Sequence, residues 1–287
     1  MDKNRIQALI TLLDDPNEEI FNSVEKQLLN ERADIVPDLE KAWESVPDTF
    51  HQQRLENLIH TIQYKDVKER IREWLLNPQD LLMGAYLICR YQYPSLRPET
   101  LEAQIEQLRK DIWLELNDHL TALERVRVIN HILFDIHGFR RNNTSYLSPR
   151  STFISDVFES KKGNPISLAL IYSVIAQRLG LPIYGVNLPK NFILAYLDDS
   201  LELSSVDSNY EMPVLFYINP VNKGSVLGRR EIDFFIKQQK LEMKSSYYLP
   251  CENRDIIYRM LNNLFYAFES NGNKSKALEI QELMSLF

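Results

Sequence analysis

The residues with the clearest chemical potential lie at one predicted helix start, where Asn164 and Pro165 are followed closely by Ser167. An asparagine side chain can accept a hydrogen bond from a free amide of a first helical turn, and proline fits the first helical position. A serine hydroxyl becomes a nucleophile only when a general base contacts it, because it ionises far above neutral pH. A serine one turn into a helix is more often a satisfied polar residue, so we favour the inert interpretation of Ser167.

The other reactive side chains form no pattern typical of a metal site or a disulfide. Cys89 and Cys251 are far apart in the sequence, and we expect both to be buried free thiols. His131 and His137 lie on one predicted helix, at a spacing that does not place them on one face. The sequence therefore predicts no metal site and no cofactor. The remaining histidines are His51, His60 and His119.

Basic residues flank the predicted helix start and leave two interpretations open. Free amides at a helix start, together with nearby cations, can bind an anion. A solvated loop is the more common role for such lysines and arginines. The residues concerned are Lys161, Lys162 and Lys190, with Arg140, Arg141 and Arg150 in the preceding loop.

The helix that starts at Pro165 is expected to pack on a small sheet. It runs to Leu179 with apolar residues directed inward, and Gly180 closes it. A second helix is predicted to begin near Arg230. One helix followed by consecutive strands is typical of an α+β fold with an antiparallel sheet. Runs rich in β-branched and aromatic residues predict strands at 183–188, 192–197 and 214–218, with the acidic, serine-rich residues 198–211 between the last two.

Helical patterns extend on both sides of this predicted core, which occupies residues 121–250. Residues 1–120 show apolar stripes at helical spacing, a pattern that resembles a HEAT-like stack without a fixed period. Such a stack could form a concave binding surface, but a helical cap on the main domain is the interpretation we favour. Residues 251–287 predict two helices joined by a turn at Gly272, similar to a single tetratricopeptide-type hairpin.

The composition excludes several classes of protein. With 287 residues, 44% hydrophobic and 25% charged, the chain is typical of a soluble globular protein with one large or two modest domains. The formal net charge of -7 argues against a broad nucleic-acid surface, which needs clustered Lys and Arg. No apolar run approaches the ~18 residues of a membrane span, and no secretory signal is visible. We therefore expect a cytoplasmic protein with no nucleic-acid or membrane partner.

A set of short motifs occurs in one order between residues 133 and 222: Leu133-Phe134, Gly138-Phe139-Arg140, Tyr146, Pro149-Arg150, Lys162-Gly163-Asn164-Pro165-Ile166-Ser167-Leu168, Leu179-Gly180-Leu181-Pro182, Gly185-Val186-Asn187-Leu188-Pro189 and Asn219-Pro220. This combination resembles the transglutaminase-like core of the SirB-type bacterial proteins, within the papain/transglutaminase-like superfamily. The resemblance implies a mainly helical α+β fold, in which a central helix packs on an antiparallel sheet between helical flanking segments.

The resemblance also implies where catalytic groups would lie. The superfamily uses a cysteine at the start of the central helix, a histidine that carries protons, and an Asp or Asn that orients the histidine. By this resemblance the cysteine position falls on Pro165, the histidine position on Asn191 and the aspartate position on Asn219. All three positions lack the groups that this chemistry needs. Ser167 is the nearest hydroxyl, and neither asparagine can act as its base.

We therefore expect a catalytically inactive protein that binds a peptide or protein partner in the vestigial cleft. Around Pro165, the neutral groups of Asn164, Ser167, Asn191 and Asn219 would line that cleft. Amide side chains suit the recognition of amides, because each offers both a donor and an acceptor.

Two alternative functions remain open from the sequence. The chain could be a cysteine-independent hydrolase or acyltransferase, with His131 or His137 reaching the cleft from the preceding helix. An imidazole within hydrogen-bond reach of Ser167 would favour that enzyme. The chain could instead be a structural scaffold, which a large exposed apolar patch on the N-terminal helices would favour.

Overall fold

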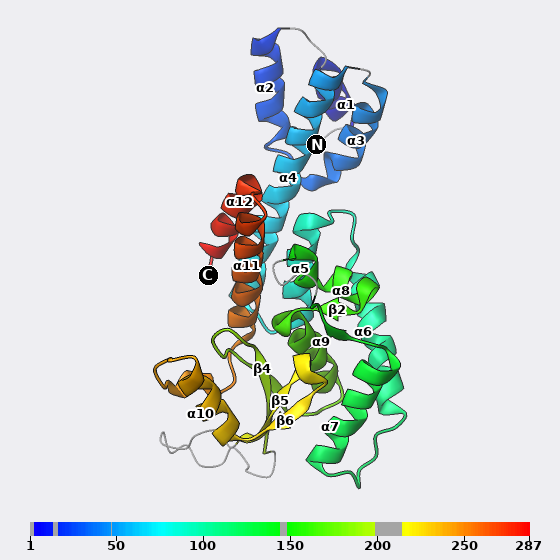
Figure 1. Ribbon diagram of the computed structural model, residues 1–287. Coiled ribbons are helices and arrows are strands. Elements are labelled where there is room, and N and C mark those ends of the chain that lie inside the picture. The colour runs from blue at the N-terminus through cyan, green and yellow to red at the C-terminus, as the bar shows by residue number, and fades with distance from the viewer. Residues whose placement is uncertain (1–2, 14–16, 47, 144–147, 199–213) are drawn as a thin grey trace. The chain divides into compact units, whose positions relative to one another are not determined.

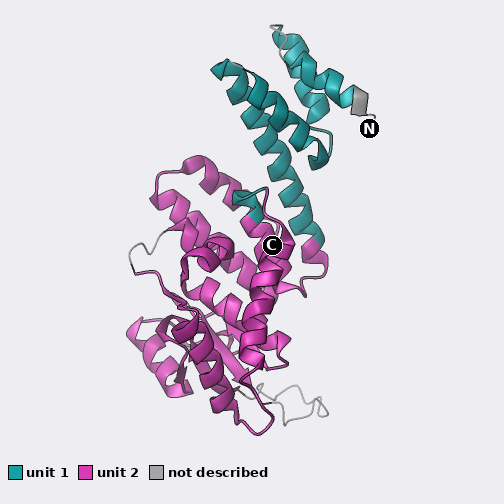
Figure 2. Ribbon diagram, turned by 90° about the vertical axis from the view of Figure 1, so that its right-hand side faces the viewer, with its two compact units in different colours: residues 1–73, 90–94 teal, residues 74–89, 95–287 magenta. Residues whose placement is uncertain are grey.

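The computed structural model describes residues 3–13, 17–46, 48–143, 148–198 and 214–287 (Figure 1). Tyr146 of the family motifs and nearly all of the acidic segment 198–211 lie outside the described residues. The chain forms two compact units: residues 1–73 with 90–94, and residues 74–89 with 95–287 (Figure 2). The mainly helical α+β class expected from the sequence is confirmed.

The first unit consists of helices around an apolar core that includes the buried residues Leu28, Leu39 and Leu58. Two of the apolar stripes in the sequence, at residues 55–62 and 67–75, lie on a single helix of 28 residues, because no glycine or proline interrupts that segment. Its elements are α1 (Lys3–Leu12), α2 (Glu18–Leu28), the 3-10 turn η1 (Ala33–Ile35), α3 (Val36–Ser45) and α4 (Thr49–Leu76), whose last residues belong to the second unit.

The second unit begins with helices whose ends have identifiable causes. After α5 (Leu81–Gln92), Pro98 opens α6 (Pro98–Trp113) in a position where no backbone N–H is needed. A reciprocal capping box starts α7 (Ala122–Asn130). The chain then passes into the π-helical segment η2 (His131–Ile136). Gly138 follows with φ of 72°, the left-handed conformation that favours glycine at the end of a helix.

The buried centre of this unit is α9 (Pro165–Arg178), in which every residue from 166 to 176 is buried. Such burial is expected of a helix that is apolar nearly all round. The helix packs on β3 (Ile183–Val186) and β4 (Ile193–Leu197). The antiparallel sheet has the order β3-β4-β5-β6, completed by β5 (Val214–Asn219) and β6 (Ser225–Leu227). The three predicted strands are confirmed, whereas the three-residue β6 is too short to give a sequence pattern.

Helices cover both faces of this sheet. On the face opposite α9, α10 (Arg229–Gln238) places Ile232 and Ile236 in an apolar cluster with residues of β3, β4 and β5. Adjacent residues of a strand point to opposite faces. Ile193 and Leu194 are both 0% exposed, so β4 is buried on its two sides. β4 is therefore enclosed between α9 on one face and α10 on the other.

The C-terminal helices α11 (Asn253–Ser270) and α12 (Lys274–Met284) pack against each other, and Gly272 makes the turn between them with φ of 75°. α11 also contacts α9 and the 3-10 turn η3 (Pro149–Ser151). The tetratricopeptide-type assignment of this pair stays a prediction. The remaining short elements are α8 (Ile154–Ser160), β1 (Arg140–Arg141) parallel to β2 (Lys162–Gly163), η4 (Pro220–Asn222) and η5 (Ser245–Tyr247).

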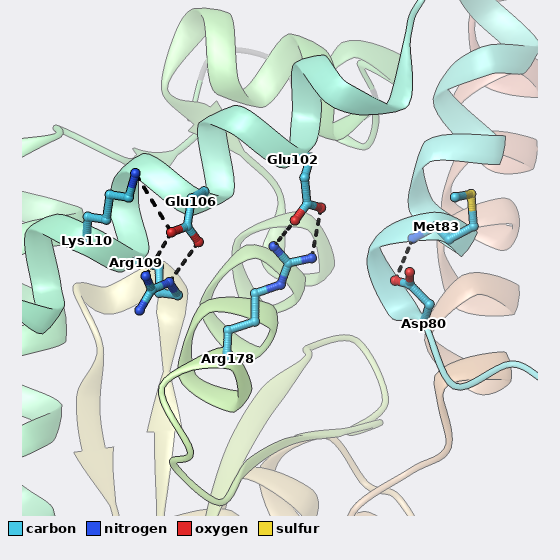
Figure 3. Close-up of polar contacts among 7 residues, drawn as sticks. All are labelled: Asp80, Met83, Glu102, Glu106, Arg109, Lys110 and Arg178. Atoms are coloured by element: carbon cyan, nitrogen blue, oxygen red, sulfur yellow. Dashed lines mark hydrogen bonds and ion pairs between the residues drawn. The ribbon is translucent and has the colours of Figure 1, made fainter.

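An ion pair ties α6 to the C-terminal end of α9 (Figure 3). The Arg178 guanidinium donates through both terminal nitrogens to the two carboxylate oxygens of Glu102, at 2.5 and 2.9 Å. Hydrogen bonding to Glu102 raises the pKa of Arg178. One helical turn further along α6, Glu106 pairs with Arg109 at 2.7 Å. The pair of Arg178 with Glu102 thus joins the two helices at the C-terminal end of α9. The predicted site lies at the other end of α9.

Candidate functional site

A reciprocal capping box closes the start of α9. The Asn164 Oδ1 accepts the backbone N–H of Ser167 at 3.0 Å, and the backbone N–H of Asn164 donates to the Ser167 Oγ at 3.0 Å. The Asn164 Nδ2 donates to the Thr152 Oγ1 at 2.8 Å. Pro165 occupies the first helical position. Most of the hydrogen-bonding capacity of Asn164 is therefore used to hold the helix start.

The Ser167 hydroxyl is likewise committed to the fold. Ser167 is 0% exposed, and its Oγ donates to the carbonyl oxygen of Ser151 at 2.7 Å. The Ser167 Oγ also accepts the Asn164 N–H, so the hydroxyl acts as both a donor and an acceptor. No imidazole of the described residues contacts this oxygen. The hydroxyl thus has neither a general base nor access to solvent, which are the two requirements of a serine nucleophile.

The two histidines of the enzyme hypothesis have other partners. The His137 Nε2 lies 2.8 Å from the Asp111 Oδ2 of α6, and the His131 Nδ1 lies 3.6 Å from the Asp135 Oδ2. Within the described ranges, no group of three or more His, Cys, Asp or Glu side chains could hold a metal ion. None of the helices in those ranges combines the length and apolar character that a bilayer crossing needs.

The cysteines offer no substitute nucleophile. Both are free thiols; Cys89 is buried and Cys251 is half-buried. Burial raises the pKa of Cys89 to about 11 and the pKa of Cys251 to about 12. Since the thiolate is the reactive form, both side chains are protonated and unreactive at neutral pH.

Close backbone packing surrounds the Ser167 oxygen. A Cβ placed on Gly163 would lie 2.6 Å from the Ser167 Oγ and 3.0 Å from the Leu168 Cγ. Only glycine fits such a position without displacing its neighbours. The oxygen is therefore held by three hydrogen bonds, the third a donation to the Asn164 carbonyl oxygen at 3.1 Å, and it is confined by the strand that precedes the helix.

A cleft of about 230 Å³ opens beside this helix start, within the second unit. Three of the five residues predicted for the site line it: Asn164, Pro165 and Asn191. The structure does not bring the other two to the cleft wall. The remaining lining residues are Ser148, Thr152, Ile166, Lys190, Phe192, Arg259, Asn263, Tyr266 and Ala267.

Ser167 and Asn219 stand apart from this cleft for different reasons. Ser167 points its hydroxyl back toward Ser151, behind the helix start. Asn219 ends β5, where its carbonyl oxygen accepts the Gly224 N–H at 3.0 Å. Its side-chain Oδ1 is buried and accepts no hydrogen bond from any described residue. The neutral cleft expected from the sequence is thus lined by two of its four polar members.

Sequence reasoning missed the contribution of α11 to the cleft wall. Arg259, Asn263 and Tyr266 project from successive turns of this helix. Arg259 is half-buried, and its Nη1 donates to the Asn187 Oδ1 at 3.3 Å. The one sequence signal for Arg259 was its place next to Met260 in the apolar stripe of this helix; Met260 is 0% exposed.

Comparison with known proteins agrees with this geometry. A profile described as the transglutaminase-like superfamily matches residues 99–262, from the first turn of α6 to the middle of α11. This is more than half of the chain. The chain belongs to the transglutaminase-like superfamily. The family resemblance stated from the sequence motifs is thereby confirmed, and the match includes both the start of α9 and Arg259.

Relatives of this transglutaminase-like chain occur in several bacteria. It is 32% identical over 204 residues to a UPF0162 protein of Xylella fastidiosa strain Temecula1, covering 69% of this chain and 68% of the relative. A UPF0162 protein of Pseudomonas aeruginosa is 25% identical over 204 residues, 70% of each chain. F-box only protein 21 of Mus musculus is 24% identical over 159 residues, 55% of this chain but 24% of that protein. No solved structure matches significantly.

The transglutaminase-like fold is thus present, with three neutral residues at the positions that the resemblance assigns to catalysis. The resemblance assigns the cysteine position to Pro165, whose side chain carries no nucleophile. It assigns the histidine position to Asn191, whose Oδ1 accepts the Phe192 N–H at 2.9 Å. It assigns the aspartate position to Asn219, which lies outside the cleft wall. The polar side chains of the cleft wall, among them Asn164, Asn191 and Lys190, can form hydrogen bonds with a polar ligand.

Proposed function

We propose that this protein is a catalytically inactive member of the superfamily and that it binds a segment of peptide or protein in the cleft at the start of α9. The observation that carries this proposal is the Ser167 hydroxyl, which donates to Ser151 and accepts from Asn164 while the neighbouring cleft stays open. A hydroxyl held in this way supports the fold and is not available to the cleft as a nucleophile.

The lining of the cleft favours a peptide as the ligand. The Asn263 side chain makes no hydrogen bond to other described residues, and the Asn191 Nδ2 has no acceptor among them. Both can therefore bond to a backbone amide or a polar side chain. Tyr266, 52% exposed, and Phe192 add aromatic surface to the same wall. Aromatic and amide groups together are common in sites that recognise peptides.

Two adjacent asparagines of α11 provide a matched test of binding. Asn263 lines the cleft, whereas Asn262, also half-buried, does not. The labelled full-length protein, N263W and N262W would be applied to an array of synthetic hexapeptides of varied sequence. We expect N263W to fill the cleft and to lower binding by about tenfold, while N262W stays within about twofold of the unsubstituted protein. Thermal unfolding would verify that both variants fold.

The absence of binding, or equal binding by N263W and the unsubstituted protein, would refute the peptide-binding function. Inactivity has its own assay, in which a fluorescent primary amine and a glutamine-containing protein are the substrates. We expect no amine incorporation above background by the unsubstituted protein or by S167A. Turnover that S167A abolishes would show that Ser167 is a nucleophile and would overturn the proposal.

A further inference from the structure

The cleft differs in charge from the protein as a whole. The chain carries a formal net charge of -7. The two charged residues that line the cleft, Lys190 and Arg259, are both cations, and no Asp or Glu of the described residues is part of its wall. The start of α9 adds the positive end of a helix dipole at the same wall. An acidic protein thus presents a local positive site.

Arg259 is the half-buried member of this pair of cations. Its Nη1 donates to the neutral Oδ1 of Asn187 at 3.3 Å, and no carboxylate of the described residues pairs with it. Burial alone lowers the pKa of Arg259, which is the direction expected when a cation loses water without gaining an anion. Arg178 shows the opposite shift, because its pKa is raised by Glu102. The other nitrogens of Arg259 remain available to a ligand.

Two further polar side chains of the cleft wall, Asn191 and Lys190, offer donors to a ligand. The Asn191 Oδ1 already accepts the Phe192 N–H, which leaves the Nδ2 as the group that can bond outward. Lys190 has φ of 60° and uses one of its three N–H donors on the Gln239 Oε1 at 3.1 Å. A wall with a guanidinium, an ammonium and an amide N–H₂ matches a ligand group that only accepts hydrogen bonds and carries negative charge.

We infer that the cleft recognises a carboxylate of the bound peptide and that Arg259 is the residue that specifies it. This inference rests on the proposed binding function. The carboxylate is either the C-terminus of the peptide or the side chain of an Asp or Glu. The cleft volume of about 230 Å³ suits one such group with its adjoining backbone, since pockets for drug-sized ligands are about 300 to 1,000 Å³. The guanidinium can bind both carboxylate oxygens at once.

The peptide array tests this inference when each hexapeptide is synthesised in matched forms. Asp and Glu are present or replaced by Asn and Gln, and the C-terminus is free or amidated. We expect forms with a carboxylate to bind about 10- to 100-fold more tightly than the neutral forms, as charge-assisted hydrogen bonds do. Comparison of the two acidic forms shows whether the side chain or the terminus is recognised.

Two substitutions on α11 assign the preference to one side chain. R259Q removes the charge, and we expect it to abolish the preference for acidic over neutral forms. R259K keeps the charge but not the two-point geometry, so it should retain part of the preference. R254Q is the matched control, because Arg254 is exposed on the same helix and donates to the Phe287 carbonyl oxygen, away from the cleft wall. It should bind like the unsubstituted protein.

The possible failures are distinguishable. If peptides bind in an N263W-sensitive manner without preference for carboxylates, or if R259Q keeps the preference, the carboxylate inference is wrong and the binding function stands. If no form binds above the level of N263W, both proposals fail. Inorganic phosphate and acetate at equal ionic strength serve as competitors. Displacement of bound peptide by phosphate and not by acetate would overturn the inference in favour of a phosphoryl group.

Discussion

The hydroxyl of Ser167 should stabilise the fold, and the unfolding free energy of S167A tests this directly. The substitution removes the donor to the Ser151 carbonyl oxygen and the acceptor of the Asn164 N–H. Those two groups also bond to each other at 3.0 Å, so neither is left without a partner. We therefore expect a loss near the lower end of the range for a buried polar group, about 1 to 2 kcal/mol of unfolding free energy.

The tight contact between Gly163 and the Ser167 Oγ allows S167A to be combined with G163A in a double-mutant cycle. G163A adds a methyl group that would lie 2.6 Å from the Ser167 Oγ, and should cost about 1 to 3 kcal/mol through overpacking. In the S167A background the oxygen is gone, although the Leu168 contacts at 3.0 and 3.1 Å remain. We therefore expect G163A to cost about 1 kcal/mol less in that background than in the unsubstituted protein.

Urea denaturation monitored by tryptophan fluorescence measures these free energies of unfolding, provided that the signal comes from the second unit. Trp74 and Trp113 belong to that unit, and Trp43 to the first, so the W43F background isolates the relevant transition. The reasoning fails if S167A unfolds at the same urea concentration as its parent. It also fails if the two substitutions add without interaction, since the hydroxyl would then not occupy the space that the structure assigns to it.

Three further predictions test other parts of the second unit. R178M removes the exposed pair with α6 and should lower stability by less than about 1 kcal/mol, an effect that added salt should erase in urea titrations. G224A should unfold at a markedly lower temperature than G180A: both glycines have positive φ, but only at Gly224 would the new Cβ meet another side chain, at 1.9 Å. Finally, the folded pKa values of Cys251 and Tyr248 are both about 12, raised mainly by burial from 9.0 and 10.0. The unfolded chain loses these protons first, so the urea midpoint should fall as pH rises from about 9 to 12; a constant midpoint would contradict the assigned burial.

The sequence predicted those parts of the fold that depend on local signals. The start of α9 was recognisable because Asn164 and Pro165 have fixed roles in the first helical turn. Three strands followed from β-branched and aromatic runs. The division of α4 into two stripes shows the limit of such reasoning, because apolar spacing alone does not reveal whether a helix continues between two buried segments.

The composition of the cleft wall was only partly predictable. Asn164, Pro165 and Asn191 are near one another in the motif order of the family, and the structure places them in one wall. Arg259 and Asn263 come from a helix much later in the chain, brought to the cleft by the packing of α11 on α9 and η3. Ser167 could not be oriented from sequence, because helical spacing does not specify whether a side chain near a helix start faces solvent or the preceding strand.

The buried Oδ1 of Asn219 has a consequence for any attempt to introduce the superfamily's cysteine, histidine and aspartate into this chain. Substituting aspartate there would place an anion where no described group donates a hydrogen bond to it. Desolvation would favour the protonated acid, so the new residue would supply little negative charge to orient an introduced histidine. Such a design would thus require new hydrogen-bond donors around β5 in addition to a cysteine at position 165.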